Sequence, residues 1–183
     1  PEAVASAHAG HAPGRVRNVL LLHSYHSNYE WTSEVTRGIT TKLERQPFET
    51  ELWVEYMDAK RTRPEERREW MRRLLADKYK GLKLDLVIAS DDDAAAYMAS
   101  EDNGVARDVP VVYCGVSSKE LLERLPRERF TGVEEVFKAS DYLLAMGWFW
   151  KPEGPLVVVT DNSPTGRSMR KLHEEAMQHM PKV

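Results

Sequence analysis

Three short apolar runs, separated by amphipathic segments, constrain the fold of this chain more than any other feature. They read VLLL, LVIA and VVY, and they lie within residues 18–23, 84–90 and 110–114. Continuous apolar runs of this length are typical of strands that are buried on both faces of a sheet. The segments between them repeat apolar residues every three or four positions, which is the helical pattern. Strands that alternate with helices predict an α/β fold with a parallel sheet and helices on both faces.

The predicted elements extend along most of the chain. Strands are expected at 18–23, 50–56, 84–90, 110–114 and 130–136, with helices at 31–45, 64–79, 94–101 and after Ser118. Because crossovers between parallel strands are right-handed, few strand orders are possible, and we predict the flavodoxin-like order 2-1-3-4-5. The first two helices are then expected on opposite faces of the sheet. We interpret residues 18–136 as one α/β lobe.

Both ends of the chain differ from this pattern. Residues 1–17 are mostly small and lack any period, which predicts a disordered leader. Residues 137–183 predict the start of a second lobe, with a helix at 139–150, a strand at 156–160 and a helix opened by the loop at 161–166. A single strand cannot form a stable sheet. Either the chain is a piece of a longer protein, or this partial lobe docks on the first lobe or on another copy, which would form a homodimer.

Composition narrows the class of partner. Hydrophobic residues make up 42% of the chain and charged residues 30%, as in an ordinary soluble globular protein. The net charge of -3 argues against nucleic acid as the main partner. No apolar stretch approaches the roughly 20 residues that a membrane span needs. Cys114 is the one cysteine, so an internal disulfide is impossible.

Polar side chains gather where the predicted strands end, in the loops at 23–26, 90–93, 115–118 and 161–166. In an open α/β sheet, ligands bind beyond the carboxyl ends of the strands. The first three loops are therefore expected to share one edge of the sheet. The fourth would face them across a cleft if the second lobe were complete.

These loops offer three kinds of chemistry. Helix N-termini favour an anion, and Ser117, Ser118 and the backbone of Gly115 suit a carboxylate. Asp91 and Asp92 suit an amine or a hydroxyl donor. Aromatic side chains for stacking on an apolar body are supplied by Tyr25, Tyr29 and Trp31. An amphoteric small molecule, such as an amino acid or a related metabolite, would satisfy all three.

Each candidate also has a structural explanation. Trp31 heads the apolar stripe of the first helix and can belong to the core. Asp91 or Asp92 can cap the third helix, and Ser117 has the spacing of a capping box. His23 ends a buried strand and can satisfy neighbouring backbone groups.

Other site chemistries are less well supported. Asp91-Asp92-Asp93 on a flavodoxin-like sheet suggests a phosphoacceptor receiver, but the first strand ends in His-Ser-Tyr-His rather than in acids. His23 and His26 could bind zinc with an aspartate, although two histidines in a loop are a weak signal. The sequence contains no G-x-S-x-G elbow, no G-x-G-x-x-G and no P-loop. We therefore expect no cofactor and no enzymatic activity.

Six segments, taken together and in order, resemble a known family. They read HSYHSNYEWT, VEYMDAKR, DLVIASDDDAAAY, VPVVYCGV, FTGVEE and VVVTDNSPTG, between Val19 and Gly166. They are similar to the ABC-transporter substrate-binding-like proteins of the type I periplasmic-binding fold. Close relatives form the extracytoplasmic sensor region of bacterial histidine kinases and diguanylate cyclases. The resemblance implies two α/β lobes that close on a small ligand, with a hinge near 131–135.

The resemblance also implies a set of ligand contacts in this chain. They are His23, Ser24, Tyr25, His26, Trp31, Ser90, Asp91, Asp92, Gly115, Val116, Asp161, Ser163, Thr165 and Gly166. Under this assignment, replacing Asp92 or Trp31 by alanine would weaken binding and leave the fold nearly intact. The chain is shorter than a full member of the family, which continues for more than about a hundred further residues.

The resulting hypothesis is a non-enzymatic, periplasmic ligand-sensing domain of a bacterial membrane signalling protein, with a sensor histidine kinase as the expected parent. The parent would be anchored in the membrane, and the partner would be a small molecule. A free substrate-binding protein of an ABC importer is the alternative, because it would share the fold and the site. An enzyme on the flavodoxin-like scaffold is a third reading.

Overall fold

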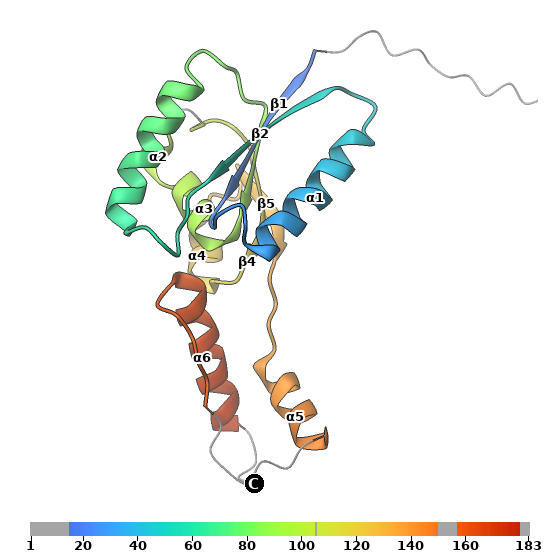
Figure 1. Ribbon diagram of the computed structural model, residues 1–183, viewed down its shortest axis with the longest axis vertical. Helices are drawn as coiled ribbons and strands as arrows, with labels where there is room; N and C mark the ends of the chain where they lie inside the picture. Colours follow the sequence, from blue (N-terminus) through green and yellow to red (C-terminus); the bar gives the residue numbers. More distant parts are fainter. Residues whose placement is uncertain (1–14, 105, 150–156, 180–183) are drawn as a thin grey trace, which may run out of the picture.

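The computed structural model describes residues 15–104, 106–149 and 157–179 (Figure 1). Its five strands form one sheet in the order β2-β1-β3-β4-β5, and every neighbouring pair is parallel. The α/β class and the predicted strand order are therefore confirmed. The strands are β1 (Arg17–His23), β2 (Thr50–Tyr56), β3 (Leu86–Ser90), β4 (Val111–Val116) and β5 (Phe130–Glu134). The helices are α1 (Glu30–Glu44), α2 (Pro64–Lys78), α3 (Asp91–Ala99), α4 (Lys119–Arg124), α5 (Ala139–Phe149) and α6 (Pro164–His179), with a 3₁₀ turn, η1, at Glu101–Asn103.

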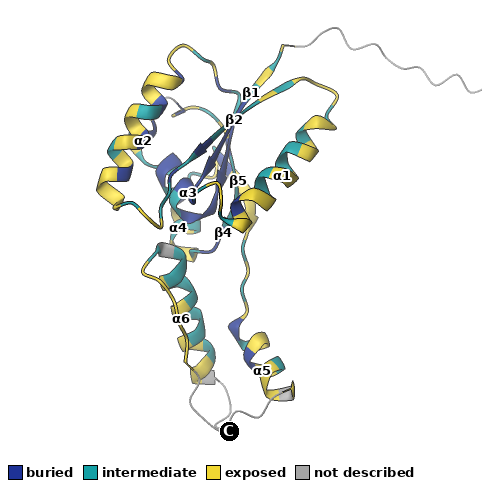
Figure 2. Ribbon diagram, viewed as in Figure 1, coloured by how far each residue is buried: buried dark blue, intermediate teal, exposed yellow. Residues whose placement is uncertain are grey.

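The strands of the sheet are mostly buried (Figure 2), and its two faces carry separate apolar layers. Leu20 and Leu22 belong to the layer shared with α2, α3 and α4, whereas Val19 and Leu21 belong to the layer shared with α1. Successive side chains of a strand point to opposite faces, so the continuous VLLL run fills both layers. The expectation that the first two helices cover opposite faces is thus confirmed.

Burial differs at several positions from what the residue type alone suggests. Trp31, which heads the apolar stripe of the first helix, is 42% exposed, and Trp70 of α2 is 46% exposed. The charged residues Glu55 on β2 and Arg67 on α2 are buried. Glu55 is buried because the end of α2 covers it, and its Oε1 accepts a hydrogen bond of 2.7 Å from the Tyr79 hydroxyl.

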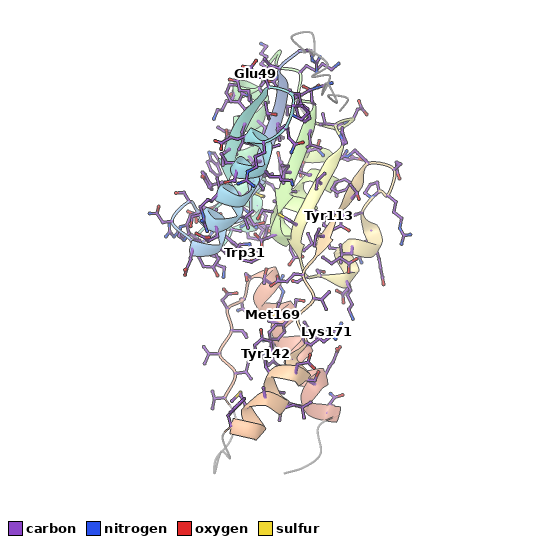
Figure 3. The ribbon with its side chains drawn as sticks, turned by 90° about the vertical axis from the view of Figure 1, so that its right-hand side faces the viewer. Trp31, Glu49, Tyr113, Tyr142, Met169 and Lys171 are labelled. Atoms are coloured by element: carbon purple, nitrogen blue, oxygen red, sulfur yellow. The ribbon has the colours of Figure 1, made fainter. Side chains whose placement is uncertain are left out.

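The register places the polar strand ends at one level. His23 of β1 pairs with Ser90 of β3, and Ser90 pairs with Cys114 of β4. Figure 3 shows Trp31 at this carboxyl edge and Glu49 at the opposite end of the sheet. Helix α6, which carries Met169 and Lys171, lies beyond the carboxyl edge in the same view.

The segment after β5 leaves the sheet and forms a pair of helices, α5 and α6 (Figure 1). Phe137 stacks on Tyr142 at 4.9 Å between ring centroids and lies 5.3 Å from the His173 ring. The predicted strand at 156–160 is wrong for residues 157–160, which are described and form no strand. They have no neighbouring strand among the described residues, and a strand needs one to satisfy its backbone. Leu156, Trp150 and residues 1–14 of the expected leader lie outside the described residues.

Candidate functional site

The carboxyl edge of the sheet meets the first turn of α6. The Tyr25 hydroxyl lies 2.7 Å from Thr165 Oγ1, and the same Thr165 oxygen donates to Asp92 Oδ2 at 3.4 Å. Lys60, which follows β2, reaches Asp161 Oδ2 at 3.2 Å. Residues separated by more than seventy positions are therefore brought together at the predicted edge. The Thr165 hydroxyl thus connects the Tyr25 and Asp92 side chains there.

Asp91 stands at the junction of β3 and α3 with a φ of 72°. Its Oδ2 accepts hydrogen bonds from Ser90 Oγ at 2.9 Å and from the Trp31 indole at 3.1 Å. Burial raises the pKa of Asp91 to about 7, and the two hydrogen bonds only partly offset that shift. A left-handed backbone is costly for a residue with a side chain and is common at functional sites.

Gly115 supplies the opposite wall of this arrangement. Its φ is 70°, and a Cβ at this position would lie 3.1 Å from the Trp31 ring and 3.2 Å from Asp91 Oδ1. Glycine is needed both for the backbone angle and for the close approach of the indole. Trp31, Asp91 and Gly115 thus form one cluster at the predicted edge. Val116, by contrast, is fully buried in the core.

Asp92 is buried and has four donors. It accepts from the backbone N–H groups of Ser117 and Ser118 at 3.1 and 3.0 Å, and from Ser117 Oγ at 2.9 Å. Thr165 Oγ1 completes the set. The carboxylate therefore occupies the start of α4, where a ligand carboxylate was expected to bind. The prediction that Ser117 caps α4 is wrong: the cap is Ser118, whose Oγ accepts from Leu121 N at 3.2 Å.

His23 and Ser24 hold the fold together behind the edge. The Thr36 hydroxyl donates to Thr32 O, so it accepts a 2.8 Å bond from His23 Nε2, and the His23 ring stacks on Tyr56. Burial lowers the pKa of His23 to about 4, so the ring is neutral near pH 7. Ser24 Oγ donates to Ser90 O at 2.7 Å and accepts from Ala94 N at 2.9 Å, which caps α3. Both residues are fully buried.

An aromatic pair surrounds the Lys60 ammonium. Its Nζ lies 4.9 Å from the Tyr25 ring centroid and 5.0 Å from that of Tyr29, within the range of cation–π attraction. His26 packs edge-on against Tyr29 at 6.0 Å, and its buried Nδ1 has no partner among the described residues. Lys60 was not among the predicted site residues, although the VEYMDAKR segment contains it.

The loop before α6 is built around two side chains. Asp161 Oδ1 accepts from Ser163 N at 2.9 Å, and Ser163 Oγ accepts from Gly166 N at 3.1 Å, which caps the helix. Hydrogen bonds from Ser163 lower the pKa of the Asp161 carboxyl. Gly166 packs against Asp161 so closely that a Cβ would collide with its backbone. Asp161, Ser163 and Gly166 therefore lie close together, but their contacts with one another stabilise the loop itself.

A cavity of about 490 Å³ opens beside this contact, between the β2–α2 connection, the start of α3 and the 161–167 loop. Of the predicted site residues, Asp161 and Ser163 line it. The remaining lining is Met57, Ala59, Lys60, Thr62, Pro64, Arg67, Arg68, Asp93, Ala96, Tyr97, Asn162 and Arg167. The charged residues of α2 give no sign of this cavity in the sequence, because mixed charge has no periodic pattern that indicates burial.

Arg67 and Asp93 form a buried ion pair in the wall of this cavity. Arg67 Nη2 donates to Asp93 Oδ1 at 2.6 Å, and Nη1 donates to the Ala59 and Thr62 carbonyls at 3.1 Å. Both side chains are less than a tenth exposed. Burial raises the pKa of Asp93, and Arg67 opposes the shift. The pair ties α2 and its preceding loop to α3.

A second cavity, of about 580 Å³, lies between α4, the segment after β5 and α6. Its lining includes Ser117, Glu135, Phe137 and Leu172. None of the fourteen residues implied by the resemblance lines it. Lys171 of α6 crosses beside it to Glu120 at 3.0 Å.

One solved structure is similar to this chain in fold. It is described as the Lac repressor dimer bound to operator and the anti-inducer ONPF, and it superposes with a TM-score of 0.52 at 14% identity. The alignment covers 87% of this chain and 50% of the repressor chain, so this chain spans half the length of that protein. The shared fold is that of a type I periplasmic-binding lobe. At this identity the likeness concerns the fold alone.

No model of a known protein family matches the chain, and no curated protein sequence matches it significantly. Within the described residues, none of the helices is both long and apolar enough to cross a membrane. In the same residues, no group of three His, Cys, Asp or Glu side chains is placed to hold a metal ion.

Proposed function

We propose that this chain is part of a periplasmic small-molecule sensor, from a protein similar to the ABC-transporter substrate-binding-like family. The parent would be a membrane-anchored signalling protein, with a sensor histidine kinase as the preferred assignment. One observation carries the proposal: Thr165, in the first turn of α6, contacts the strand-end residues Tyr25 and Asp92 directly. A ligand bound at this edge would change the same contacts that connect α6 to the sheet.

The proposed mechanism is a population shift. A ligand moves an equilibrium between two arrangements only by the difference in its affinity for them. Such a difference in affinity requires groups from two parts of the chain. Lys60 belongs to the sheet lobe and Asp161 to the loop before α6, and the two are paired at the edge. The domain itself would perform no reaction. A free substrate-binding protein of an importer would use the same mechanism, and the two differ only in what the chain is joined to.

A thermal-shift screen against a metabolite library tests the proposal. A bound ligand raises the melting temperature by mass action, by an amount that grows with its concentration over Kd. The site assignment is tested with Trp31→Ala, which should lose at least tenfold in affinity for any hit, since the indole faces Asp91 and Gly115. Trp70→Ala is the matched control, because Trp70 is equally exposed but lies on α2.

Four outcomes decide between the readings. Loss of the shift in Trp31→Ala alone supports binding at the carboxyl edge. An equal loss in Trp70→Ala would remove that support. A library without any hit would count against a small-molecule sensor. Conversion of a hit into product, dependent on Asp91, would replace the sensor by an enzyme.

A further inference from the structure

The 490 Å³ cavity has two walls from separate parts of the chain. Lys60, Thr62 and Arg68 come from the β2–α2 connection and α2, whereas Asn162 and Arg167 come from the loop before α6 and from α6 itself. Its volume is within the range of small-molecule sites. A molecule held there would contact both walls and would therefore stabilise their present arrangement.

The charges lining this cavity do not cancel. Arg67 pairs with Asp93 at 2.6 Å and Lys60 pairs with Asp161 at 3.2 Å. The two other cations are Arg68 and Arg167, and no further carboxylate lines the cavity in the part of the chain that is described.

Both of these arginines can turn toward a ligand. The Arg68 side chain is 59% exposed, and its ion-pair partner Asp102 does not line the cavity. The two side chains are as far apart as 4.0 Å, so this exposed ion pair is weak. Arg167 donates to the neutral carbonyl of Asn162. Its charge also opposes the rise that burial causes in the pKa of Asp93, the carboxylate that is bonded to Arg67.

The rest of the lining is divided between polar groups and apolar surface. Thr62, Asn162 and Ser163 provide hydrogen-bonding groups near the arginines, while Met57, Pro64, Ala96 and Tyr97 provide apolar contact. Guanidinium groups bind carboxylates and phosphates through two parallel hydrogen bonds. An anion bound here would also not compete with Asp92, which fills the start of α4 on another part of the edge.

We propose that this cavity binds a small organic dianion with an apolar body, such as a phosphate monoester or a dicarboxylate, between Arg68 and Arg167. This inference rests on the proposed sensor function and names the ligand class of a second site, separate from the cluster of Trp31, Asp91 and Gly115, none of which lines the cavity. The dianion would balance the excess positive charge, and its apolar body would contact the Met57 and Tyr97 side of the cavity. Because Arg68 and Arg167 belong to different walls, binding would bridge the sheet lobe and α6.

Titration calorimetry with three probes of similar size tests the inference. Phenyl phosphate and phthalate are dianions with an aromatic body, and benzyl alcohol is a neutral analogue. We expect at least one dianion to bind at least tenfold more tightly than benzyl alcohol, with an affinity that falls as salt is raised. Binding of phenyl phosphate alone would assign the site to phosphate monoesters. Binding of phthalate alone would assign it to dicarboxylates.

The decisive variant is Arg68→Gln with Arg167→Gln, which should weaken dianion binding at least tenfold. Arg73→Gln with Arg170→Gln is the matched control: it removes the same charge from α2 and α6, at residues paired with Glu69 and Glu174 outside the cavity. Equal weakening in both double variants would overturn the inference, because it would indicate general charge attraction. Failure of both dianions to bind would overturn it as well.

The outcome can be separated from that of the proposed function. A ligand from the metabolite screen that depends on Trp31 but binds the Arg68→Gln, Arg167→Gln variant unchanged would leave the sensor function standing and remove this cavity as its site. Absence of any ligand in the screen, with phenyl phosphate and phthalate also silent, would count against both.

Discussion

At the scale of the residue, Asp91 combines an unfavourable backbone angle with a buried carboxyl group. Its pKa is about 7 in the fold against 3.8 for an unperturbed group, mainly because burial disfavours the charged form. Between about pH 4 and pH 7 the unfolded chain releases a proton that the folded chain retains. The contribution of Asp91 to stability is therefore fully present below pH 4 and is lost as the pH rises toward 7.

We expect Asp91→Asn to remove this loss of stability at rising pH. The amide oxygen can still accept from Ser90 and Trp31, and asparagine tolerates a left-handed backbone. The variant should gain on the order of 1–3 kcal/mol relative to the native chain between pH 4.5 and pH 8. Urea unfolding at the two pH values measures the gain. Asp108→Asn, at an exposed position, controls for the removal of a charge. An identical pH dependence in Asp91→Asn and the native chain would contradict the expected pKa.

Asp92→Ala is expected to unfold more easily, contrary to the expectation from the family resemblance. The change leaves two backbone N–H groups at the start of α4 and the Ser117 hydroxyl without their acceptor. Unsatisfied buried donors cost about 1–3 kcal/mol each, so a total loss of about 2–4 kcal/mol is expected after partial access of water. Equilibrium urea unfolding provides the measurement. Ser118→Ala removes only the helix cap and should cost about 1 kcal/mol. A cost for Asp92→Ala no larger than that of Ser118→Ala would refute the anchoring role.

At the scale of the element, the Arg67–Asp93 pair determines how α2 and its preceding loop sit on α3. Removal of one member of a buried pair leaves the other charge uncompensated, which typically costs about 3–5 kcal/mol. We expect Arg67→Met and Asp93→Leu each to lose stability in this range. Combined, they should cost less than the sum of the two, because neither charge remains buried alone. A double-mutant cycle in urea measures the coupling. Additive effects would mean that the carbonyl contacts of Arg67, not the ion pair, hold α2.

At the scale of the whole molecule, few polar contacts connect the sheet lobe to α6. They include Tyr25 with Thr165, Lys60 with Asp161, and Lys171 with Glu120. The helices beyond the edge also expose large apolar side chains, such as Tyr142 at 61% and Phe149 at 90%. The homodimer expected from the sequence stays a prediction, and these exposed apolar side chains would form its interface.

We expect Tyr25→Phe to loosen α6 without unfolding the sheet. The change removes one hydroxyl contact and keeps the buried ring, so global stability should fall by less than about 1.5 kcal/mol. Amide exchange in 163–170 should accelerate several-fold, while exchange in β1 and β3 stays the same. Hydrogen–deuterium exchange by mass spectrometry measures both regions. Tyr113→Phe on β4 (Figure 3) is the control. Equal acceleration in the two variants would argue against a specific link to α6.

The sequence by itself determined the architecture and the edge at which polar groups meet. Runs such as VLLL and the helical periodicity are local signals, and the handedness of crossovers then leaves few strand orders. The same reasoning places His23, Ser90 and Cys114 at one level, because parallel strands begin and end together. It also placed Trp31, Asp91 and Gly115 at that edge, where the structure brings them into contact.

Only the tertiary structure decided which partner each polar group has. Asp92 accepts hydrogen bonds from the backbone of Ser117 and Ser118, which lie 25 and 26 positions later in the chain. Arg67 is buried beside Asp93, although its neighbours on α2 face solvent. The cavity between Arg68 and Arg167 joins segments about a hundred residues apart. Hydrophobic period is a property of adjacent residues, whereas hydrogen-bond partners and cavities depend on how whole elements pack. For that reason the fold was predictable from the chain, and the charge and shape of the candidate site were not.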